Sequence, residues 1–555
     1  MAPSSDDCGW LLYLSLAAKC GGDPHRLLAF AAVFAVAFVV TALLHWAAPG
    51  GPAWGWYWWT RRAGLGITGA AIPGPRGVPV LGSMGLMTGL AHRKLAAAAA
   101  AGDKAKDKRR LMAFSLGETR VVVTADPDVA RELLASAAFA DRPVKESAYG
   151  LLFHRAIGFA PHGAYWRSLR RVASSHLFSP RQIAASAAHR AAIARQMVAA
   201  AMKQLAAGDG GAAVTVPRRL LKRASLHNVM WSVFGRRYEL LEEVESEEAA
   251  ELKSMVDEGY DLLGQLNWSD HLPWLARFDL QRTRARCAAL VPRVNRFVSR
   301  IIDDHRARLA AGDAATTMDF TDVLLSLQGT DKLSDADMIA VLWEMIFRGT
   351  DTVAVLMEWV LARLVLHQDV QSKVHEELDR VVGPGKTVTE SDTASLVYLQ
   401  AVIKEVLRLH PPGPLLSWAR LATSDVHVGG YLVPAGTTAM VNMWAITHDP
   451  AVWSDPEEFK PERFMAGSSD AADEFSVMGS NLRLAPFGSG RRSCPGKSLA
   501  MATVGFWLAT LLHEFKWLPA AEYGEPRGVD LSEVLRLSCE MATPLEARLV
   551  PRHAA

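Results

Sequence analysis

One cysteine in the C-terminal part of the sequence has neighbours that favour metal ligation. The segment 487–496 (FGSGRRSCPG) places Cys494 between glycines and close to two arginines, ahead of a stretch with a helical pattern. A helix N-terminus and nearby cations stabilise a thiolate, and glycines let backbone N–H groups approach the sulfur. An isolated cysteine is more often a small buried hydrophobe, which is how we interpret Cys287 and Cys539. The neighbours of Cys494 predict a thiolate ligand.

A second group of polar residues lies upstream, at residues 349–352 (GTDT). The capping pattern at Ser334 predicts a helix that starts there and runs past Leu366, so this motif lies mid-helix. A threonine hydroxyl in a helix can bond a backbone carbonyl or a water. For a motif this short, an ordinary polar pair on a helix face is an equal alternative.

The cysteine segment resembles the F-x-x-G-x-R-x-C-x-G haem loop of the cytochrome P-450 mono-oxygenases. The fixed residues of that pattern are Phe487, Gly490, Arg492, Cys494 and Gly496. The resemblance implies that these residues bind haem and that the Cys494 thiolate is the metal ligand, as the axial ligand of the haem iron.

Residues 349–352 resemble the oxygen-activation motif of the same family. The resemblance implies that Thr352 holds a water beside bound dioxygen and that Asp351 helps to relay protons, and so assigns catalytic roles to both.

Two further patterns imply contacts with the haem propionates. Trp166 and Arg170 are four residues apart, so the indole N–H and the guanidinium lie on one helix face, where both can donate hydrogen bonds. Arg420 resembles another propionate-binding position. A surface role is the commoner expectation for any single arginine, and it is the order and spacing of the motifs together that favour haem.

A third pattern implies a structural role. Glu405 and Arg408 form E-x-x-R, and such i, i+3 residues can pair on a helix. Alone this is usually a solvated surface pair. In the family a later arginine, here Arg463, joins them in a buried triad, and we assign the three residues to folding support.

Charge and cysteine content exclude several classes of protein. The chain has 555 residues, with 60 Lys and Arg against 58 Asp and Glu, for a net charge of +2. This balance argues against nucleic acid as the main partner, which requires a clear basic excess. The five cysteines are widely spaced and include no C-x-x-C. A disulfide framework and a zinc site are therefore both disfavoured.

The N-terminal part of the sequence predicts a membrane anchor. The segment 27–48 carries no formal charge and is long enough as a helix to span about 33 Å at about 1.5 Å per residue. A cleaved signal peptide is the alternative, but the apolar run is long for one. The Trp- and Tyr-rich stretch 54–59 suits an interfacial aromatic belt.

We predict four parts along the chain and a mainly α fold with small β-sheets. They are a short N-terminal segment (1–26), a transmembrane anchor (27–48), a linker (49–72) and a haem-thiolate mono-oxygenase domain (73–555). Helical patterns occur at 246–264, 280–311 and 398–410 and in a long helix starting at Ser179-Pro180, and strand patterns at 120–123, 431–433 and 438–441. The resemblance implies the cytochrome P-450 fold behind a single transmembrane helix.

Two other motifs carry little weight. Residues 64–69 match G-x-G-x-x-G, but they do not follow a strand or open a helix in a βαβ unit, so we interpret them as linker. Asn267 begins a glycosylation sequon, which matters only if the body is lumenal.

The segments 347–352 and 408–420 resemble a plant microsomal subfamily that includes the KLUH and plastochron proteins. Members of this subfamily are linked to organ, leaf and seed growth, and hydroxylation of medium-chain fatty acids is the usual suggestion for their activity. Arg348 departs from the wider family, which has Ala or Gly at this position. It either attracts an anionic substrate or pairs with Glu344 at i, i+4, and we favour the pair slightly because an unpaired guanidinium near a dry pocket is costly.

The predicted function is NADPH- and O2-dependent mono-oxygenation of a small lipophilic substrate. The sequence shows no credible flavin or nicotinamide site, so electrons are expected from NADPH-cytochrome P-450 reductase. Arg491 and Lys497 flank the haem loop and either steer that partner or are simply solvated. Family precedent implies the endoplasmic reticulum membrane with the body facing the cytosol. Three alternatives remain: a haem enzyme that rearranges a peroxide without a reductase, a non-catalytic haem-binding protein, and a secreted structural protein.

Overall fold

The computed structural model of the chain describes most of its length. The described residues are 24–65, 70–102, 104–207, 213–238, 240, 247–312, 318–416, 419–466, 475–479, 481–522, 525–526 and 528–553. Most of the predicted N-terminal segment, part of the G-x-G-x-x-G motif, and Ser417 and Trp418 lie outside these residues.

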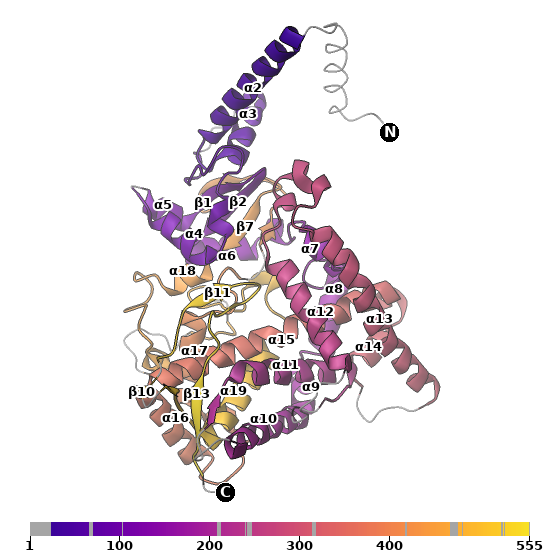
Figure 1. The fold of residues 1–555 in the computed structure, drawn as a ribbon, viewed down its shortest axis with the longest axis vertical. Helices are drawn as coiled ribbons and strands as arrows, with labels where there is room; N and C mark the ends of the chain where they lie inside the picture. The colour runs from indigo at the N-terminus through magenta and orange to yellow at the C-terminus, as the bar shows by residue number, and fades with distance from the viewer. Residues whose placement is uncertain are drawn as a thin grey trace.

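The fold is mainly helical with small sheets, as the sequence predicts (Figure 1). The α-helices are α2 (Pro24–Trp46), α3 (Pro52–Leu65), α4 (Ala91–Ala100), α5 (Ala105–Arg110), α6 (Pro127–Ala135), α7 (Glu146–Gly150), α8 (Ala164–His176), α9 (Pro180–Ala185), α10 (Ala187–Ala207), α11 (Pro217–Phe234), α12 (Glu247–Gly264), α13 (Thr283–Ala310), α14 (Phe320–Ser326), α15 (Asp335–Leu366), α16 (Gln368–Val381), α17 (Val397–Leu409), α18 (Met443–Thr447) and α19 (Lys497–Glu514).

The strands form small, separate sheets. They are β1 (Met112–Leu116), β2 (Thr119–Thr124), β3 (Ala213–Thr215), β4 (Arg420–Leu421), β5 (Val426–Val428), β6 (Tyr431–Val433), β7 (Thr438–Val441), β8 (Phe515–Pro519), β9 (Ala521–Glu522), β10 (Glu525–Pro526), β11 (Glu533–Leu535), β12 (Cys539–Met541) and β13 (Ala547–Pro551). The largest sheet has the order β1-β2-β7-β4, with β2 and β7 parallel, and a second sheet has the order β3-β13-β8.

Helix α15 crosses the middle of the body, with α11 alongside it (Figure 1). The predicted cap is confirmed, because the Ser334 hydroxyl accepts a hydrogen bond from the Asp337 N–H at 3.2 Å. The helix ends at Leu366 and not beyond it. Most of its residues are buried, including Trp343 and Trp359. Apolar side chains on nearly every face make this helix the centre of two of the hydrophobic clusters.

Most predicted elements agree with the structure. The helical patterns at 246–264, 280–311 and 398–410 correspond to α12, α13 and α17, and the three strand patterns correspond to β2, β6 and β7. Ser179 does cap a helix, accepting from the Gln182 N–H. That helix, α9, stops at Ala185, however, and the long Ala-rich helix is the separate α10.

The N-terminal helices project from the body (Figure 1). The segment Leu28–Trp46 of α2 is long and apolar enough to cross a membrane and is not buried against the protein. The next segment, predicted as a linker, contains the helix α3. Gly55 lets α3 approach α2, since a Cβ there would lie 2.0 Å from the His45 carbonyl oxygen.

The aromatic stretch in α3 is divided between two environments. Trp54 is fully buried and donates its indole N–H to the Phe114 carbonyl at 3.1 Å, and Tyr57 is also buried. Trp56 and Trp59 are more than half exposed. The prediction that all these rings form an interfacial belt is therefore wrong for Trp54 and Tyr57, which pack on the sheet of β1 and β2.

Candidate functional site

Cys494 lies in a tight loop immediately before α19. Its backbone N–H donates to the Phe487 carbonyl at 2.9 Å, and Gly496 is the N-cap of the helix. Gly490 has φ +69°, and a Cβ there would lie 2.0 Å from the Leu134 carbonyl oxygen, so only glycine fits. The loop therefore presents the sulfur at a helix N-terminus, as the sequence predicts.

The charge state of Cys494 is set mainly by burial. Burial raises the pKa of its thiol, while the Gly496 N–H and the charges of Arg348 and Arg170 lower it by less. Burial therefore opposes the thiolate form, which the Gly496 N–H and the nearby cations favour as the sequence predicts. A bound metal deprotonates a coordinating thiol outright, so this sulfur fits a ligand that acts once the metal is present.

Buried arginines gather close to Cys494. Burial and the charges of Arg492 and Arg170 lower the pKa of Arg420 to about 9. Burial also lowers the pKa of Arg170. Burial and the charges of Arg420, Arg348 and Arg492 lower the pKa of Arg142 as well.

This cluster is short of negative charge. Among the described residues, the carboxylates that act on Arg142 and Arg492 are Glu344 and Asp141. A buried cation cluster of this kind is costly without counter-charges. The two propionates of a haem supply such charges, and together with the soft sulfur donor the residues present fit this group. Arg142 was missed in the sequence, where nothing distinguishes it from other arginines.

Arg492 is held by the backbone. Its guanidinium donates to the carbonyls of Ala140, Ile157 and Ala160 at 2.8, 3.0 and 2.6 Å. It also lies over the Trp166 ring, 4.3 Å from the centroid. Arg492 therefore joins the cysteine loop to the segments before α8.

Trp166 and Arg170 share one face of α8, as their spacing predicts. The Trp166 indole N–H donates to the Ile157 carbonyl at 2.9 Å. This N–H is therefore used within the protein, which differs from the predicted donation to a propionate. Arg170 contacts the Ser493 hydroxyl at 3.5 Å and so lies beside the cysteine loop.

The motif 349–352 lies within α15. Thr350 is buried, and its hydroxyl donates to the Ile346 carbonyl at 2.7 Å. Thr352 is exposed. Asp351 forms an ion pair with Lys222 at 3.1 Å, and Lys222 also contacts Glu540 at 3.3 Å.

Asp351 has a perturbed carboxyl group. Burial raises its pKa, and the positive charge of Lys222 only partly opposes this effect. A carboxyl group held in this way can accept or release a proton closer to neutral pH than an exposed aspartate. Lys222 and Glu540 come from α11 and β12, so no spacing in the sequence connects them with Asp351.

The two remaining motif predictions have clear outcomes. Arg348 Nε lies 2.9 Å from Glu344 Oε1, so the ion pair at i, i+4 is present.

Glu405 accepts from Arg408 at 2.8 Å and from Arg463 at 3.1 Å, and all three side chains are fully buried. The triad is therefore assembled as the resemblance implies.

Comparison with known proteins decides the family. The sequence profile of the cytochrome P450 family matches residues 72–537. The chain belongs to the cytochrome P450 family. This cytochrome P450 is 60% identical to cytochrome P450 78A9 of Arabidopsis thaliana over 98% of both chains. It is 57% identical to cytochrome P450 78A3 of Glycine max over the whole of both. It is also 37% identical to a trimethyltridecatetraene synthase of Zea mays, over 86% of this chain and 88% of that protein.

The relatives confirm the subfamily as well as the family. Cytochrome P450 78A5 of Arabidopsis thaliana, which is the KLUH protein, is 50% identical over 95% of this chain. Membership implies a haem with a cysteine thiolate ligand, mono-oxygenase chemistry, and a redox partner that supplies electrons from NADPH through flavin. Members of the family generally act on lipophilic substrates.

Proposed function

We propose that this cytochrome P450 is an NADPH- and O2-dependent mono-oxygenase of the endoplasmic reticulum, with a medium-chain fatty acid or a fatty-acid-derived growth signal as its substrate. The observation that carries the proposal is the Cys494 loop with its arginines close to α15, since Arg348 on that helix acts on the Cys494 thiol. The same helix holds Asp351 and Thr352. A bound haem supplies the iron at which dioxygen is activated.

The protein side chains have separate tasks in this proposal. Cys494 is the metal ligand, and Arg170 and Arg420 neutralise the propionates with charge-assisted hydrogen bonds. Phe487, Gly490 and Gly496 shape the loop. Trp166 and Arg492 keep it packed against the segments before α8, through the contacts that they make in the structure.

Asp351 and Thr352 control the delivery of protons. The Asp351 carboxyl has a raised pKa and can pass a proton from Lys222 and solvent toward the haem site. The exposed hydroxyl of Thr352, one residue later on the same helix, can hold a water there. These roles argue against a reductase-independent enzyme that rearranges a peroxide, since that reaction needs no external proton.

The N-terminal region fits a protein held to a membrane by one helix. Helix α2 is the anchor, and α3 fixes the body close to the lipid surface, since Trp54 is docked on the body while Trp56 and Trp59 remain exposed. With the body on the cytosolic face, NADPH-cytochrome P450 reductase in the same membrane can reach it. Arg491 is exposed beside the cysteine loop and is suited to an acidic partner surface.

The test is turnover in membranes. The full chain is expressed in microsomes with a plant reductase and supplied with NADPH and a panel of substrates. The panel contains free fatty acids of graded length, their methyl esters, terpenoids and steroids, and products are identified by mass spectrometry. Hydroxylated free acids that need NADPH support the proposal. The Cys494→Ser variant is the blank.

The possible outcomes separate the parts of the proposal. A normal thiolate–carbon monoxide spectrum without acid oxidation overturns the fatty-acid assignment. Products formed from a peroxide without NADPH favour the rearranging enzyme. NADPH consumption with no product from any lipophilic extract favours a non-catalytic haem protein. Protection of the body from protease in sealed microsomes overturns the cytosolic orientation.

A further inference from the structure

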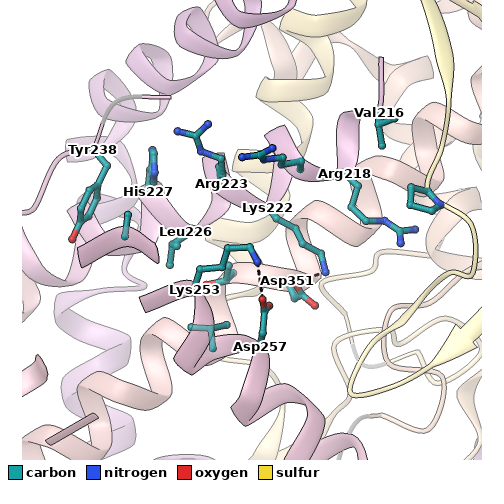
Figure 2. Close-up of a pocket in the computed structure, with 15 residues that line it drawn as sticks. Val216, Arg218, Lys222, Arg223, Leu226, His227, Tyr238, Lys253, Asp257 and Asp351 are labelled. Carbon is teal, nitrogen blue, oxygen red and sulfur yellow. Dashed lines mark hydrogen bonds and ion pairs between the residues drawn. The ribbon is translucent and has the colours of Figure 1, made fainter. Parts of the chain in front are cut away.

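A cavity of about 300 Å³ is lined mainly by residues of α11, α12 and α15. Thr350 and Asp351 form part of its wall, and none of the described residues that line it belongs to the segment around Cys494. This volume is at the lower end of the range for small-molecule sites. Figure 2 shows the side chains of α11 above this space and those of α12 below it.

The wall combines apolar and cationic side chains. Its apolar surface comes from Val216, Leu226, Val256, Ala249, Pro544 and the ring of Tyr238. Among the described residues of the wall, the cationic side chains are Arg218, Arg219, Lys222, Arg223 and Lys253, and the carboxylates are Asp257 and Asp351. His227 adds no charge at neutral pH, because burial and the charges of Arg223 and His189 lower its pKa to about 4.

Several of these charges are already balanced. Lys253 pairs with Asp257 at 2.8 Å, and Lys222 lies between Asp351 and Glu540. Arg218 is paired with Glu358 at 2.7 Å. Figure 2 shows Lys222 directed at Asp351 and Lys253 beside Asp257.

Arg219 differs from these three residues. Its side chain is exposed, and it has no ion-pair partner among the residues that the structure describes. An exposed cation on the wall of a largely apolar cavity is suited to the head group of a ligand whose chain lies inside. A guanidinium can bind a carboxylate through two parallel hydrogen bonds.

We propose that this cavity binds an amphiphilic monocarboxylate, with its alkyl chain against Leu226 and Val256 and its carboxylate at Arg219. None of the described residues that line it is among the residues assigned above to haem binding. Asp351 and Lys222 are part of the wall of this cavity, so a chain bound there displaces water from the Asp351 carboxyl group and from its Lys222 partner. Binding here does not require turnover, so it stands or falls independently of the proposed function.

Photolabelling of the haem-loaded full chain in membranes tests this proposal. The probe is dodecanoic acid with a diazirine near its terminal methyl group, and labelled peptides are mapped by mass spectrometry. We expect labelling within α11 and α12 that excess dodecanoate removes. The methyl ester of the same probe is expected to label these helices at least fivefold less, because it lacks the charge.

Three variants sharpen the result. Arg219→Glu is expected to reduce labelling of these two helices at least fivefold, and Val256→Trp is expected to abolish it by filling the cavity. The matched control is Arg181→Glu, which reverses an exposed arginine on α9 away from the cavity and leaves labelling unchanged. An unchanged carbon monoxide spectrum verifies that each variant is folded. Equal labelling by acid and ester, equal labelling of Arg219→Glu and wild type, or no label on α11 and α12 overturns the proposal.

Discussion

Arg348 and Glu344 form an ion pair one turn apart on α15, with Nε and Oε1 separated by 2.9 Å. The Gly158 N–H also donates to both carboxylate oxygens, at 2.8 and 3.1 Å. Glu344 is almost fully buried, and burial raises its pKa although Arg348 opposes this effect. Arg348 thus serves as the counter-charge of a buried carboxylate, which accounts for an arginine where the wider family has a small residue.

Removing Arg348 should therefore affect stability more than substrate choice. In Arg348→Ala, Glu344 loses its counter-charge and its pKa rises further. We expect a loss of about 1–3 kcal/mol, seen as a fall in the thermal midpoint of the native carbon monoxide spectrum. Activities toward a fatty acid and its methyl ester should fall by the same factor.

The double variant Arg348→Ala/Glu344→Gln is the control for this interpretation. The amide removes the buried charge and still accepts from the Gly158 N–H, so stability should largely return. A selective loss of activity toward the free acid in Arg348→Ala, with an unchanged thermal midpoint, would instead identify Arg348 as a substrate-binding residue.

The Arg348 pair illustrates how far the sequence alone could lead. Contacts within one helix or one loop follow from spacing, so the pair, the Ser334 cap and the shape of the Cys494 loop were predictable. Motif resemblance supplied the buried triad of Glu405, Arg408 and Arg463, whose members lie far apart in the chain. Neither source could anticipate partners that only tertiary packing brings together.

Two residues show why those partners were missed. Lys222 reaches Asp351 because α11 packs along α15. The sequence around residue 222 contains no motif that predicts this contact. Trp166 was expected to donate to a ligand, but the backbone carbonyl of Ile157 lies within hydrogen-bond reach of its N–H. Backbone acceptors are present at every residue, so a sequence gives no sign of which one a side chain meets.

Lys222 is expected to set the pH dependence of turnover. Burial raises the pKa of the Asp351 carboxyl, and the Lys222 charge lowers it in part. Lys222→Met removes the opposing charge, so the pKa of Asp351 rises further and the carboxyl ionises only at higher pH. If ionised Asp351 relays protons, the acidic limb of the profile of kcat against pH moves to higher pH.

Lys222→Arg is the matched control, because it retains the charge and should leave the acidic limb near its original position. The comparison is made with one substrate at saturating concentration over the pH range in which the carbon monoxide spectrum is intact. If the acidic limb lies at the same pH in Lys222→Met and in Lys222→Arg, Asp351 takes no part in the rate-limiting proton transfer.

Arg420 should have opposite effects on the haem-free and haem-bound protein. Burial and the charges of Arg492 and Arg170 lower its pKa to about 9. A base whose pKa is lower in the folded state destabilises that state in full below this pH, and the penalty disappears as the pH rises toward the ordinary arginine value. Arg420→Gln therefore relieves repulsion in the haem-free protein at pH 7.

The same variant removes a partner of the haem propionates. We expect haem to transfer to an acceptor protein about tenfold faster from Arg420→Gln than from wild type, which corresponds to one charge-assisted hydrogen bond. The haem-free variant should melt no lower than haem-free wild type at pH 7. Arg131→Gln, at an exposed arginine paired with Asp128, is the control. An unchanged rate of haem loss would remove Arg420 from the propionate site.

Trp54 and Trp56 should differ in their importance for stability although they are two residues apart. Trp54 is fully buried, and its indole N–H donates to the carbonyls of Phe114 and Val121 at 3.1 and 3.3 Å. Trp54→Ala leaves a cavity and two weakened contacts, at an expected cost of about 3–5 kcal/mol. Trp56 is 58% exposed, and Trp56→Ala should cost less than about 1 kcal/mol. Thermal midpoints of the full chain in membranes, with hydrogen exchange of β1 and β2, measure both effects. Equal small effects would mean that α3 is not docked on the sheet in the membrane-bound protein.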